Sequence, residues 1–449
     1  MSSASVNDPT VRTGPTSLLG VARRLVGGVI VAPVGTEPER GRTSAVVTAI
    51  LATALAITIA LSVARATRFG VDSWSITEWL INYQGGFVRR GLGGAVLSWL
   101  SSATAVAPNI LAIGASVVAY LALLGWFLRA TRGLLPVAVV LSSVLAGGFV
   151  FGEYLIRKDA LLVLLFVAAT TIFRRSWPGG LGTVLINLLV CIGVLLHEAA
   201  FFMAFPALVA TACARDMSAG RSFLAAASSA AVRFAPVLIT FLIVFRFSGD
   251  DAIARAINAS LQDVWRGVDP TGCCFAEPAA AIDSLRWTAA HGVSLTLEEL
   301  TTFSLGLWVP LAWLGTIAVF WWVLATSARA APTGAPVPAH PAADLTAVMA
   351  LQLCAIFPLF VVGVDFGRWI TLWTCSSVAL WTTGLARGLP LFGPLGRAIV
   401  RSGSAVLAWR PAPLLFLLVG LPGCCWTVAR WLAATPVGAT LKAAIKVAF

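Results

Sequence analysis

Stretches of about 20 consecutive apolar residues recur along almost the whole chain, and this feature constrains the fold more than any other. A helix of this length crosses the roughly 30 Å hydrocarbon core of a bilayer. Hydrophobic residues make up 59% of the 449 residues, and the mean hydropathy is +0.90. A soluble core cannot hide so much apolar surface. The sequence therefore predicts an all-α, polytopic membrane protein.

We expect about 11 transmembrane helices, with the N-terminus in the cytoplasm. The candidate spans are 45–64, 109–128, 134–152, 160–173, 181–196, 199–214, 234–247, 303–325, 345–363, 369–386 and 412–430. Arg23, Arg24, Arg40 and Arg42 precede the first span, and basic residues favour the cytoplasmic side of a membrane. The same rule, applied to the later loops, sets the expected direction of each span.

The stretch 91–105 is apolar, but it is short and rich in glycine and serine. If it crossed the membrane, Arg129, Arg132 and the Arg174–Arg175 pair would face the outside. If it lies in the interface or re-enters, these four arginines face the cytoplasm, as the charge rule requires. We therefore predict that 91–105 does not span the bilayer.

The predicted loops divide the chain into five parts. Residues 1–44 form a polar tail without the apolar core of a cleavable signal, and we expect it to be disordered and cytoplasmic. The other parts are an N-terminal transmembrane module at 45–247, which includes an extracytoplasmic loop at 65–108, an extracytoplasmic loop at 248–300, a C-terminal transmembrane module at 301–430 and a tail at 431–449.

The net charge of +12 fits loops that face an anionic lipid leaflet. A nucleic-acid partner would call for basic residues clustered on one face. In this chain they are scattered between the apolar segments instead. We therefore expect the lipid bilayer as a partner, and no nucleic acid.

The acidic residues gather on one side of the predicted membrane. Fourteen of the 19 fall on the outer face under this topology. They are Asp72, Glu78, Glu153, Asp159, Glu198, Asp250, Asp251, Asp263, Asp269, Glu277, Asp283, Glu298, Glu299 and Asp365. Acidic residues contribute little to orientation, so this asymmetry needs another cause. Charge at a membrane boundary is costly unless it is solvated or used, which marks the outer face as the functional one.

The first polar segment follows the first predicted span. Asp72 and Glu78 flank an amphipathic helix at 74–83, whose aromatic residues suit the outer interface. Arg89 and Arg90 come next, beside several glycines. Adjacent arginines on a flexible backbone can capture a phosphate by paired hydrogen bonds, although they can also extend to lipid headgroups.

The second polar segment runs from Glu153 to Asp159, between two predicted spans. Arg157, Lys158 and Asp159 are three consecutive charges directly before an apolar helix. A solvated turn with local ion pairs would explain them as well as a substrate-binding role.

The third polar segment is the His197–Glu198 pair, which interrupts a long apolar run. Such a run must turn back on itself, and this pair marks the turn. It is not a zinc-protease HExxH motif, because position 201 is Phe. A histidine and a carboxylate at the tip of a helical hairpin favour a functional role over simple packing.

The fourth polar segment contains Asp365 and Arg368, again at a predicted hairpin tip. Residues three apart can pair across one helical turn, which is a purely structural explanation. Both side chains would also suit the binding of a phosphate or of sugar hydroxyls. Together, the four segments provide the carboxylates, cations and imidazole needed to bind an anionic headgroup and move a proton.

This layout resembles the GT-C superfamily of membrane glycosyltransferases, which use polyprenyl-phosphate sugars. Members have a cytoplasmic N-terminus and a first extracytoplasmic loop that holds an acidic catalytic residue and an interfacial helix. Asp72 and Glu78 occupy that loop here, spaced Asp-x5-Glu where the family often has paired acids. The strings at 86–92 and 365–369 are also similar to strings in multipass proteins of bacterial surface-polysaccharide loci.

The resemblance implies an inverting glycosyltransferase in the bacterial inner membrane, with its active site facing the periplasm. Its donor would be a polyprenyl-phosphate-linked sugar, and its acceptor a glycan or glycolipid. Asp72 is the first choice as catalytic base, Glu78 and Glu198 are alternatives, and His197 would orient a carboxylate or share the proton. The expected phosphate- and substrate-binding residues are Arg89, Arg90, Arg157, Lys158, Asp159, Asp365 and Arg368.

Elementary chemistry is compatible with this assignment. A lipid-phosphate sugar is already activated, so the enzyme needs a base for the acceptor hydroxyl and cations for the leaving phosphate. The chain contains neither a GxxxxGK[ST] loop nor a dinucleotide fingerprint. No organic cofactor is therefore expected, while a divalent cation at the carboxylates stays open.

Eight cysteines are present, and they give no sign of a metal site. The adjacent pairs Cys273–Cys274 and Cys424–Cys425 lack CxxC spacing. A disulfide between the two pairs is an open alternative, because both lie toward the outer face of the predicted topology.

Two other functions stay open. The first is a polymerase or ligase of the O-antigen type, which joins lipid-diphosphate oligosaccharides. The second is a lipid-glycan flippase or secondary transporter. Transporters usually place charge near the membrane midplane in repeated, broken helices. We find no internal repeat, and the predicted charge lies at one face, which favours the transferase.

Overall fold

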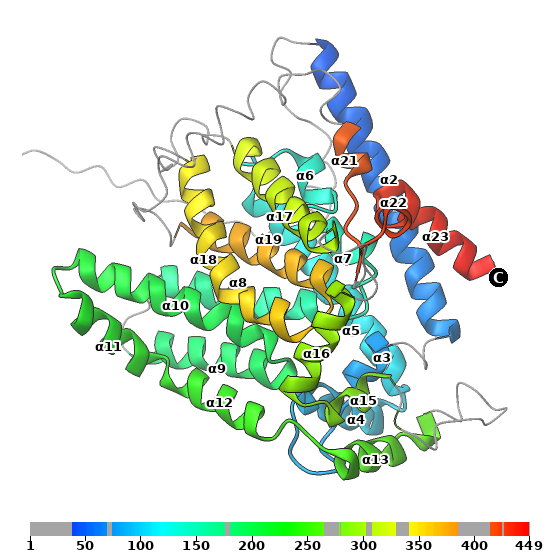
Figure 1. Cartoon of the computed structure of the whole chain (residues 1–449), viewed down its shortest axis with the longest axis vertical. Coiled ribbons are helices and arrows are strands. Elements are labelled where there is room, and N and C mark those ends of the chain that lie inside the picture. The colour runs from blue at the N-terminus through cyan, green and yellow to red at the C-terminus, as the bar shows by residue number, and fades with distance from the viewer. Residues whose placement is uncertain are drawn as a thin grey trace, which may run out of the picture. The chain divides into compact units, whose positions relative to one another are not determined.

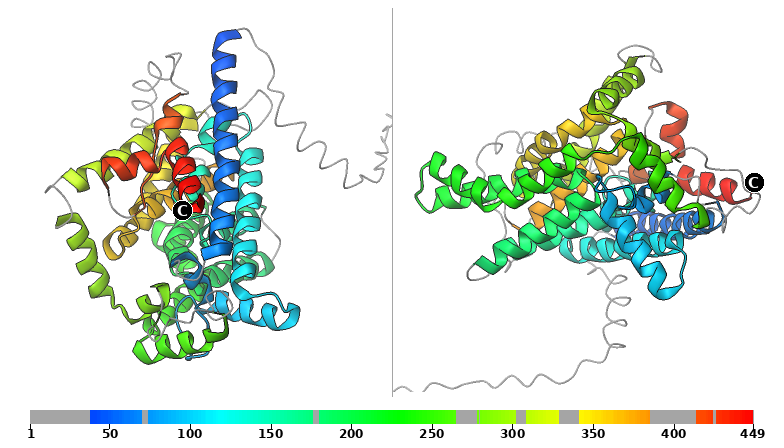
Figure 2. Two further views of the ribbon diagram at one scale, coloured as in Figure 1. Left: turned by 90° about the vertical axis from the view of Figure 1, so that its right-hand side faces the viewer. Right: turned by 90° about the horizontal axis from the view of Figure 1, so that it is seen from below.

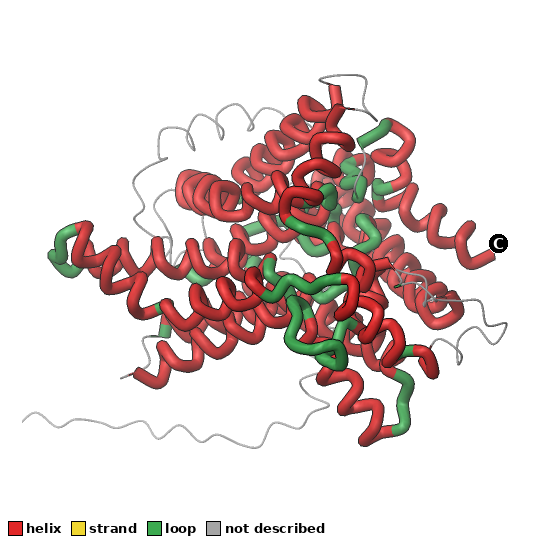
Figure 3. Tube along the Cα trace, turned by 60° about the horizontal axis from the view of Figure 1, so that its bottom comes forward, coloured by secondary structure: helices red, strands yellow, loops and turns green. Residues whose placement is uncertain are grey.

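A computed structural model describes residues 38–69, 74–175, 180–264, 278, 280–301, 308–328, 341–384, 414–423 and 426–448. Every regular element in these ranges is a helix, as Figures 1 and 3 show. The predicted all-α fold is therefore confirmed for the described part of the chain. Residues 44–449 form one compact unit, and the account below concerns this unit.

The helices follow one another along the chain with short connections. They are α2 (Pro38–Phe69), α3 (Trp74–Leu80), α4 (Gly91–Thr104), α5 (Pro108–Ala130), α6 (Val137–Leu141), α7 (Gly147–Phe151), α8 (Asp159–Arg174), α9 (Gly180–Leu196), α10 (Ala199–Ser218), α11 (Phe223–Arg233), α12 (Ala235–Arg246), α13 (Asp251–Ser260), α15 (Ala280–Asp283), η2 (Ser284–Arg286), α16 (Ala289–Thr301), α17 (Trp308–Ser327), α18 (Pro341–Val362), α19 (Phe366–Thr382), α21 (Leu415–Leu418), α22 (Val428–Ala433) and α23 (Pro436–Ala448).

Five of the described helices are long and apolar enough to cross a membrane. They are Ser44–Thr67 within α2, and α5, α10, α17 and α18. A sixth candidate is the pair α11 and α12, which is bent by 59°. The chain thus has the character of a polytopic membrane protein. The larger number of about 11 spans stays a prediction.

Two predicted spans do not form continuous helices, and both predictions are wrong in this respect. Residues 134–152 fold into the five-residue helices α6 and α7, and every residue of both helices except Val137 is buried. A close turn joins them, because a Cβ at Gly147 would collide with the carbonyl oxygen of Leu141. The other case is 412–430, where residues 419–423 separate α21 from α22 without helix. Gly420, Pro422 and Gly423 explain this break.

Helix α4 corresponds to the short apolar stretch 91–105. Its 14 residues extend about 21 Å at 1.5 Å per residue, less than the thickness of a hydrocarbon core. Arg90 before it and Ala105 after it both adopt the left-handed conformation, which stops the helix at each end. This length agrees with the expectation that the segment does not span, while the side on which it lies stays a prediction.

Helix α3 is shorter and more buried than the interfacial helix predicted at 74–83. It ends at Leu80, and the five residues from Ile76 to Leu80 are buried inside the protein. It packs against α4, α5 and α15. The indole N–H of Trp79 donates to the carbonyl oxygen of Ile156 at 3.0 Å. The expected interfacial position is therefore wrong: its aromatic residues contact protein on several sides rather than lipid headgroups.

Helix α19 is the most enclosed of the longer helices. All of its residues from Phe366 to Trp381 are buried, and α8, α10, α17 and α18 pack around it (Figure 1). Helices α9, α10 and α12 pack against one another beside this centre, as the further views in Figure 2 also show. The central helix begins with Arg368 in its first turn, so the packing carries one cation into the interior.

Candidate functional site

Four turns that are far apart in the sequence meet at one place in the structure. They are the α3–α4 region, the segment before α8, the α9–α10 turn and the α18–α19 turn. Their charged side chains form one connected set, which we call the ion network. Its members are Glu78, Arg90, Arg157, Lys158, Asp159, His197, Glu198, Asp365 and Arg368.

The innermost part of the ion network is a paired arginine. Arg368 Nε donates to Asp159 Oδ2 at 2.8 Å, and its Nη2 donates to Asp159 Oδ1 at 2.7 Å. The same Nη2 reaches Glu78 Oε1 at 3.2 Å. None of these side chains is more than 3% exposed. This parallel two-bond geometry is the strongest form of an arginine–carboxylate pair.

His197 lies against Glu78 and is itself buried. Its Nδ1 accepts a hydrogen bond from the Ala199 backbone N–H at 3.1 Å, which places the ring proton on Nε2. Nε2 lies 3.0 Å from Glu78 Oε1, although its N–H direction is not aligned with that oxygen. The second oxygen of Glu78, Oε2, has no hydrogen-bond partner in the described part of the chain. This carboxylate therefore retains capacity to accept a proton.

Arg90 and Glu198 form the first of two outer ion pairs. Arg90 Nε lies 2.9 Å from Glu198 Oε2 and 3.1 Å from Oε1, and Arg90 Nη2 also contacts Oε1. The Glu198 side chain is 20% exposed. Glu198 Oε2 also lies 3.5 Å from His197 Nδ1. The pair thus connects an open carboxylate to the buried imidazole.

Arg157 and Asp365 form the second outer ion pair. Arg157 Nη1 donates to Asp365 Oδ2 at 2.7 Å, and Asp365 is 26% exposed. The Nε of Arg157 is buried and has no hydrogen-bond partner among the described residues. Buried polar groups normally have a partner, so this donor is available for one that arrives with a ligand or water.

Lys158 lies beneath both outer pairs and is fully buried. Its ammonium donates to the backbone carbonyls of Arg90 at 3.1 Å and Leu196 at 3.2 Å, and it faces the Trp79 ring at 5.6 Å. Burial lowers the pKa of Lys158 to about 8. The lysine joins the turn before α4 to the turn after α9.

The electrostatics of the ion network are balanced. Arg90, Arg157, Lys158 and Arg368 oppose four carboxylates, and burial lowers the pKa of His197, which favours its neutral form. Burial opposes ionisation of Glu78, but Arg368 and then His197 outweigh it and hold the pKa of that carboxyl well below its usual range. Burial likewise opposes ionisation of Glu198, but Arg90 holds its pKa well below the usual range.

Arg89 does not belong to the ion network, in contrast to the expected Arg89–Arg90 phosphate clamp. Its Nη2 donates to the carbonyl oxygen of Ser284 at 2.6 Å, with Trp287 O at 3.4 Å. Its backbone N–H donates to Phe247 O at 3.0 Å. Because consecutive side chains leave the chain in different directions, Arg90 turns inward while Arg89 holds the 284–287 segment.

Other predicted residues lie outside the described part of the chain. Asp72, the first choice as catalytic base, is one of them, and so are Cys273, Cys274, Cys424 and Cys425. Among the described residues, no group of three or more His, Cys, Asp or Glu side chains could hold a metal ion. The described carboxylates of the ion network contact cations of the protein itself.

One part of the site was not found from the sequence. Glu153 has a left-handed backbone with φ of 66° and accepts from Lys442 at 3.0 Å and Lys446 at 2.8 Å. It therefore joins the segment before α8 to α23 rather than entering the ion network. The spacing of the two lysines, four residues apart, was the only available signal, and it identifies a helix face but not its partner.

The comparisons with known proteins add no relative to this geometry. No protein-family model, no curated protein sequence and no solved structure matches this chain.

Proposed function

We propose that this protein is a membrane-embedded glycosyltransferase of the GT-C kind. It would use a polyprenyl-phosphate-linked sugar at the periplasmic face of a bacterial inner membrane, and build a cell-envelope polysaccharide or glycolipid. One observation carries the proposal: four separate turns bring a carboxylate, two partly exposed arginines and a histidine to one open edge of a buried ion network.

The outer edge of the ion network suits a lipid-linked phosphate. Arg90 and Arg157 are each held by a carboxylate that is partly exposed, while Arg157 Nε has an unused hydrogen bond among the described residues. A phosphate oxygen can accept from these guanidinium groups in the same geometry as a carboxylate. An arriving phosphate therefore has donors that are already positioned, which lowers the cost of binding.

The reaction proceeds by attack of an acceptor hydroxyl on the anomeric carbon of the donor sugar. The new bond joins the acceptor oxygen to that carbon, and the bond between the carbon and the phosphate oxygen breaks. The lipid phosphate leaves with the bonding electron pair and is stabilised by Arg90 and Arg157. The proton of the acceptor hydroxyl passes to a carboxylate, so charge and atoms balance.

Glu198 is the best-placed described residue for the role of base. It is the exposed carboxylate that also approaches His197, at 3.5 Å. While Arg90 holds it, its pKa is well below the usual range and its basicity is weak. A phosphate that takes hydrogen bonds from Arg90 would release Glu198 and raise its affinity for a proton. Asp72 remains the alternative base.

The test is transfer of radiolabelled sugar from a panel of polyprenyl-phosphate sugars by the protein in liposomes. Glu198→Gln keeps the size of the side chain but removes its basicity, and we expect a fall in rate of about 10²–10⁴-fold with donor binding retained. Glu153→Gln is the matched control, because Glu153 pairs with two lysines outside the ion network, and its rate should stay close to that of the wild type.

Two results would contradict the proposal in different ways. If Glu198→Gln is active while Asp72→Asn is not, the base is Asp72 and the assignment to Glu198 is wrong. If the wild type transfers no sugar from any donor but moves lipid-linked glycan across the liposome membrane, the transporter alternative replaces the transferase. Activity only on lipid-diphosphate oligosaccharides would identify a polymerase or ligase.

A further inference from the structure

A second polar site lies on the other side of the protein wall from the ion network. Helices α2 and α23, the start of α3 and the segment 153–156 enclose a pocket of about 110 Å³, which we call the boundary pocket. The side chains that concern its chemistry are Ser62, Arg65, Ser75, Glu153 and Lys446. No member of the ion network lines it. Ile156, whose carbonyl accepts the Trp79 indole N–H, forms the wall between them.

The boundary pocket has unused hydrogen-bonding groups. Within the described residues, no side-chain hydrogen bond or ion pair engages Ser62, Arg65 or Ser75. Lys446 and Lys442 share the single carboxylate of Glu153. Three cations therefore face one anion around this pocket, and the excess positive charge selects a negatively charged ligand. Two hydroxyls beside an arginine and a lysine are suitable donors for phosphate oxygens.

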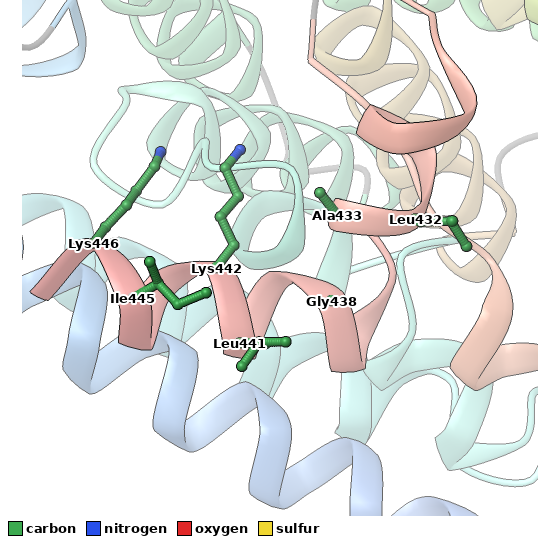
Figure 4. A pocket seen from close by; sticks show the side chains of 7 residues that line it. All are labelled: Leu432, Ala433, Gly438, Leu441, Lys442, Ile445 and Lys446. Atoms are coloured by element: carbon green, nitrogen blue, oxygen red, sulfur yellow. The ribbon is translucent and has the colours of Figure 1, made fainter. Parts of the chain in front are cut away.

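An apolar groove continues from the boundary pocket along α23. It has a volume of about 470 Å³, and Lys446 lines both (Figure 4). Leu432, Leu441 and Ile445 provide its apolar surface, and each is at least half exposed. Lys442 and Lys446 extend from one side of α23 in the same view. A ligand that fills both spaces needs an anionic head and a hydrocarbon chain.

The depths of the two spaces match a lipid in a bilayer. The candidate span of α2 ends at Thr67, so Arg65 lies at the level where the hydrocarbon core ends. Thr440 Oγ1 lies 2.8 Å from Thr58 Oγ1 and 3.3 Å from Ala54 O. Thr58 is about 10 Å deeper than Arg65 along α2, at 1.5 Å per residue. The groove beside Thr440 is thus at chain depth and the boundary pocket at headgroup depth.

We propose that the boundary pocket and the α23 groove form a binding site for one anionic glycerophospholipid of the surrounding bilayer. The phosphate lies against Arg65, Lys446 and the two serine hydroxyls, and an acyl chain follows Leu441 and Ile445. The sugar-bearing phosphate of the proposed donor must reach the ion network, which Ile156 and Trp79 separate from this pocket. The lipid bound here is therefore a different molecule from the donor.

The test is native mass spectrometry of the full-length protein in mild detergent, titrated with phosphatidylglycerol or with phosphatidylcholine. We expect the wild type to retain one phosphatidylglycerol selectively. The double variant Arg65→Gln/Lys446→Gln should bind it roughly 25-fold more weakly, since each basic residue contributes about fivefold. Ala443→Phe, which places a ring in the boundary pocket, should lose the same lipid without a change in charge.

The matched control is Arg174→Gln/Arg175→Gln. It removes two exposed arginines at the end of α8 that line neither the pocket nor the groove. We expect it to retain the lipid, and the unfolding midpoint of each variant shows that it is folded. Equal loss in both double variants, equal retention of phosphatidylcholine, or displacement of the lipid by stoichiometric polyprenyl phosphate would each overturn the proposal.

Discussion

The ammonium group of Lys158 donates a hydrogen bond to the backbone carbonyl of Arg90 at 3.1 Å. The two residues are 68 positions apart in the chain. The bond fixes the backbone from which the Arg90 side chain turns toward Glu198. Because Arg90 itself has a left-handed backbone, with φ of 64°, the lysine stabilises a conformation that a non-glycine residue adopts at a cost.

The close approach of Lys158 to α4 depends on a glycine. A Cβ at Gly93 would lie 3.0 Å from Cε and 3.1 Å from Nζ of Lys158. Gly93→Ala should therefore displace the lysine and lower both the unfolding midpoint and the transfer rate. Gly114→Ala, in α5, is the control, because its Cβ would have no neighbour within 4 Å. Equal behaviour of the two variants in thermal unfolding would contradict this role for Gly93.

Removal of the central arginine should destabilise the fold strongly. Arg368→Met leaves Asp159 and Glu78 buried without their cation, and breaking a buried pair costs about 3–5 kcal/mol. The measurement is the free energy of unfolding in detergent. Arg255→Met serves as the control, since Arg255 pairs with Asp251 at the surface and such pairs contribute less than about 1 kcal/mol. A small effect of Arg368→Met would show that the buried carboxylates are protonated.

Stability should rise with pH above about 8 because of Lys158. Its pKa is about 8 in the folded protein, against about 10.4 in an unfolded chain. Between these values the unfolded chain holds the proton and the folded protein has released it, so increasing pH favours the folded state. Below pH 8 the lysine is charged in both states and its contribution is constant.

The measurement for Lys158 is the difference in unfolding free energy between the wild type and Lys158→Met from pH 7 to pH 10. This difference should move in favour of the wild type above about pH 8. Lys442→Met, which removes a lysine that is 39% exposed, should show no comparable slope. A flat difference curve for Lys158→Met would mean that the lysine is not deprotonated in the folded protein.

Arg89 should control the attachment of the 284–287 segment. Arg89→Gln removes the donors to Ser284 O and Trp287 O, so trypsin should cleave faster after Arg286, which is 33% exposed. Arg246→Gln is the control, because Arg246 stacks on Phe247 without holding that segment. Unchanged cleavage after Arg286 would show that other contacts hold it.

Several features of the fold and the site could be predicted from the sequence. The lengths of the apolar runs identified α2, α5, α10, α17 and α18, because a periodic apolar helix needs little tertiary information. Interrupted segments could not be predicted so well. The break between α6 and α7 depends on a close contact between Gly147 and Leu141, which apolar composition does not reveal.

The polar turns were recognised, but their partners were not. A charge at a hairpin tip is visible in the sequence, as with His197 and Glu198. Which cation meets which carboxylate depends on the packing of helices that are far apart in the chain. Arg89 and Arg90 illustrate this limit: they are adjacent and chemically identical, yet one joins a backbone loop and the other a buried carboxylate.

The ion pairs of Arg368 impose an order on the biosynthesis of the protein. Arg368 follows Asp159 by 209 residues and Glu78 by 290. At about 5–20 residues per second, Asp159 waits roughly 10–40 s for its partner after it leaves the ribosome. The early helices must therefore be kept from closing around uncompensated carboxylates until α19 arrives. A nascent chain that stops before Arg368 carries two unmatched acids, and membrane quality control has a chemical means to distinguish it from the finished protein.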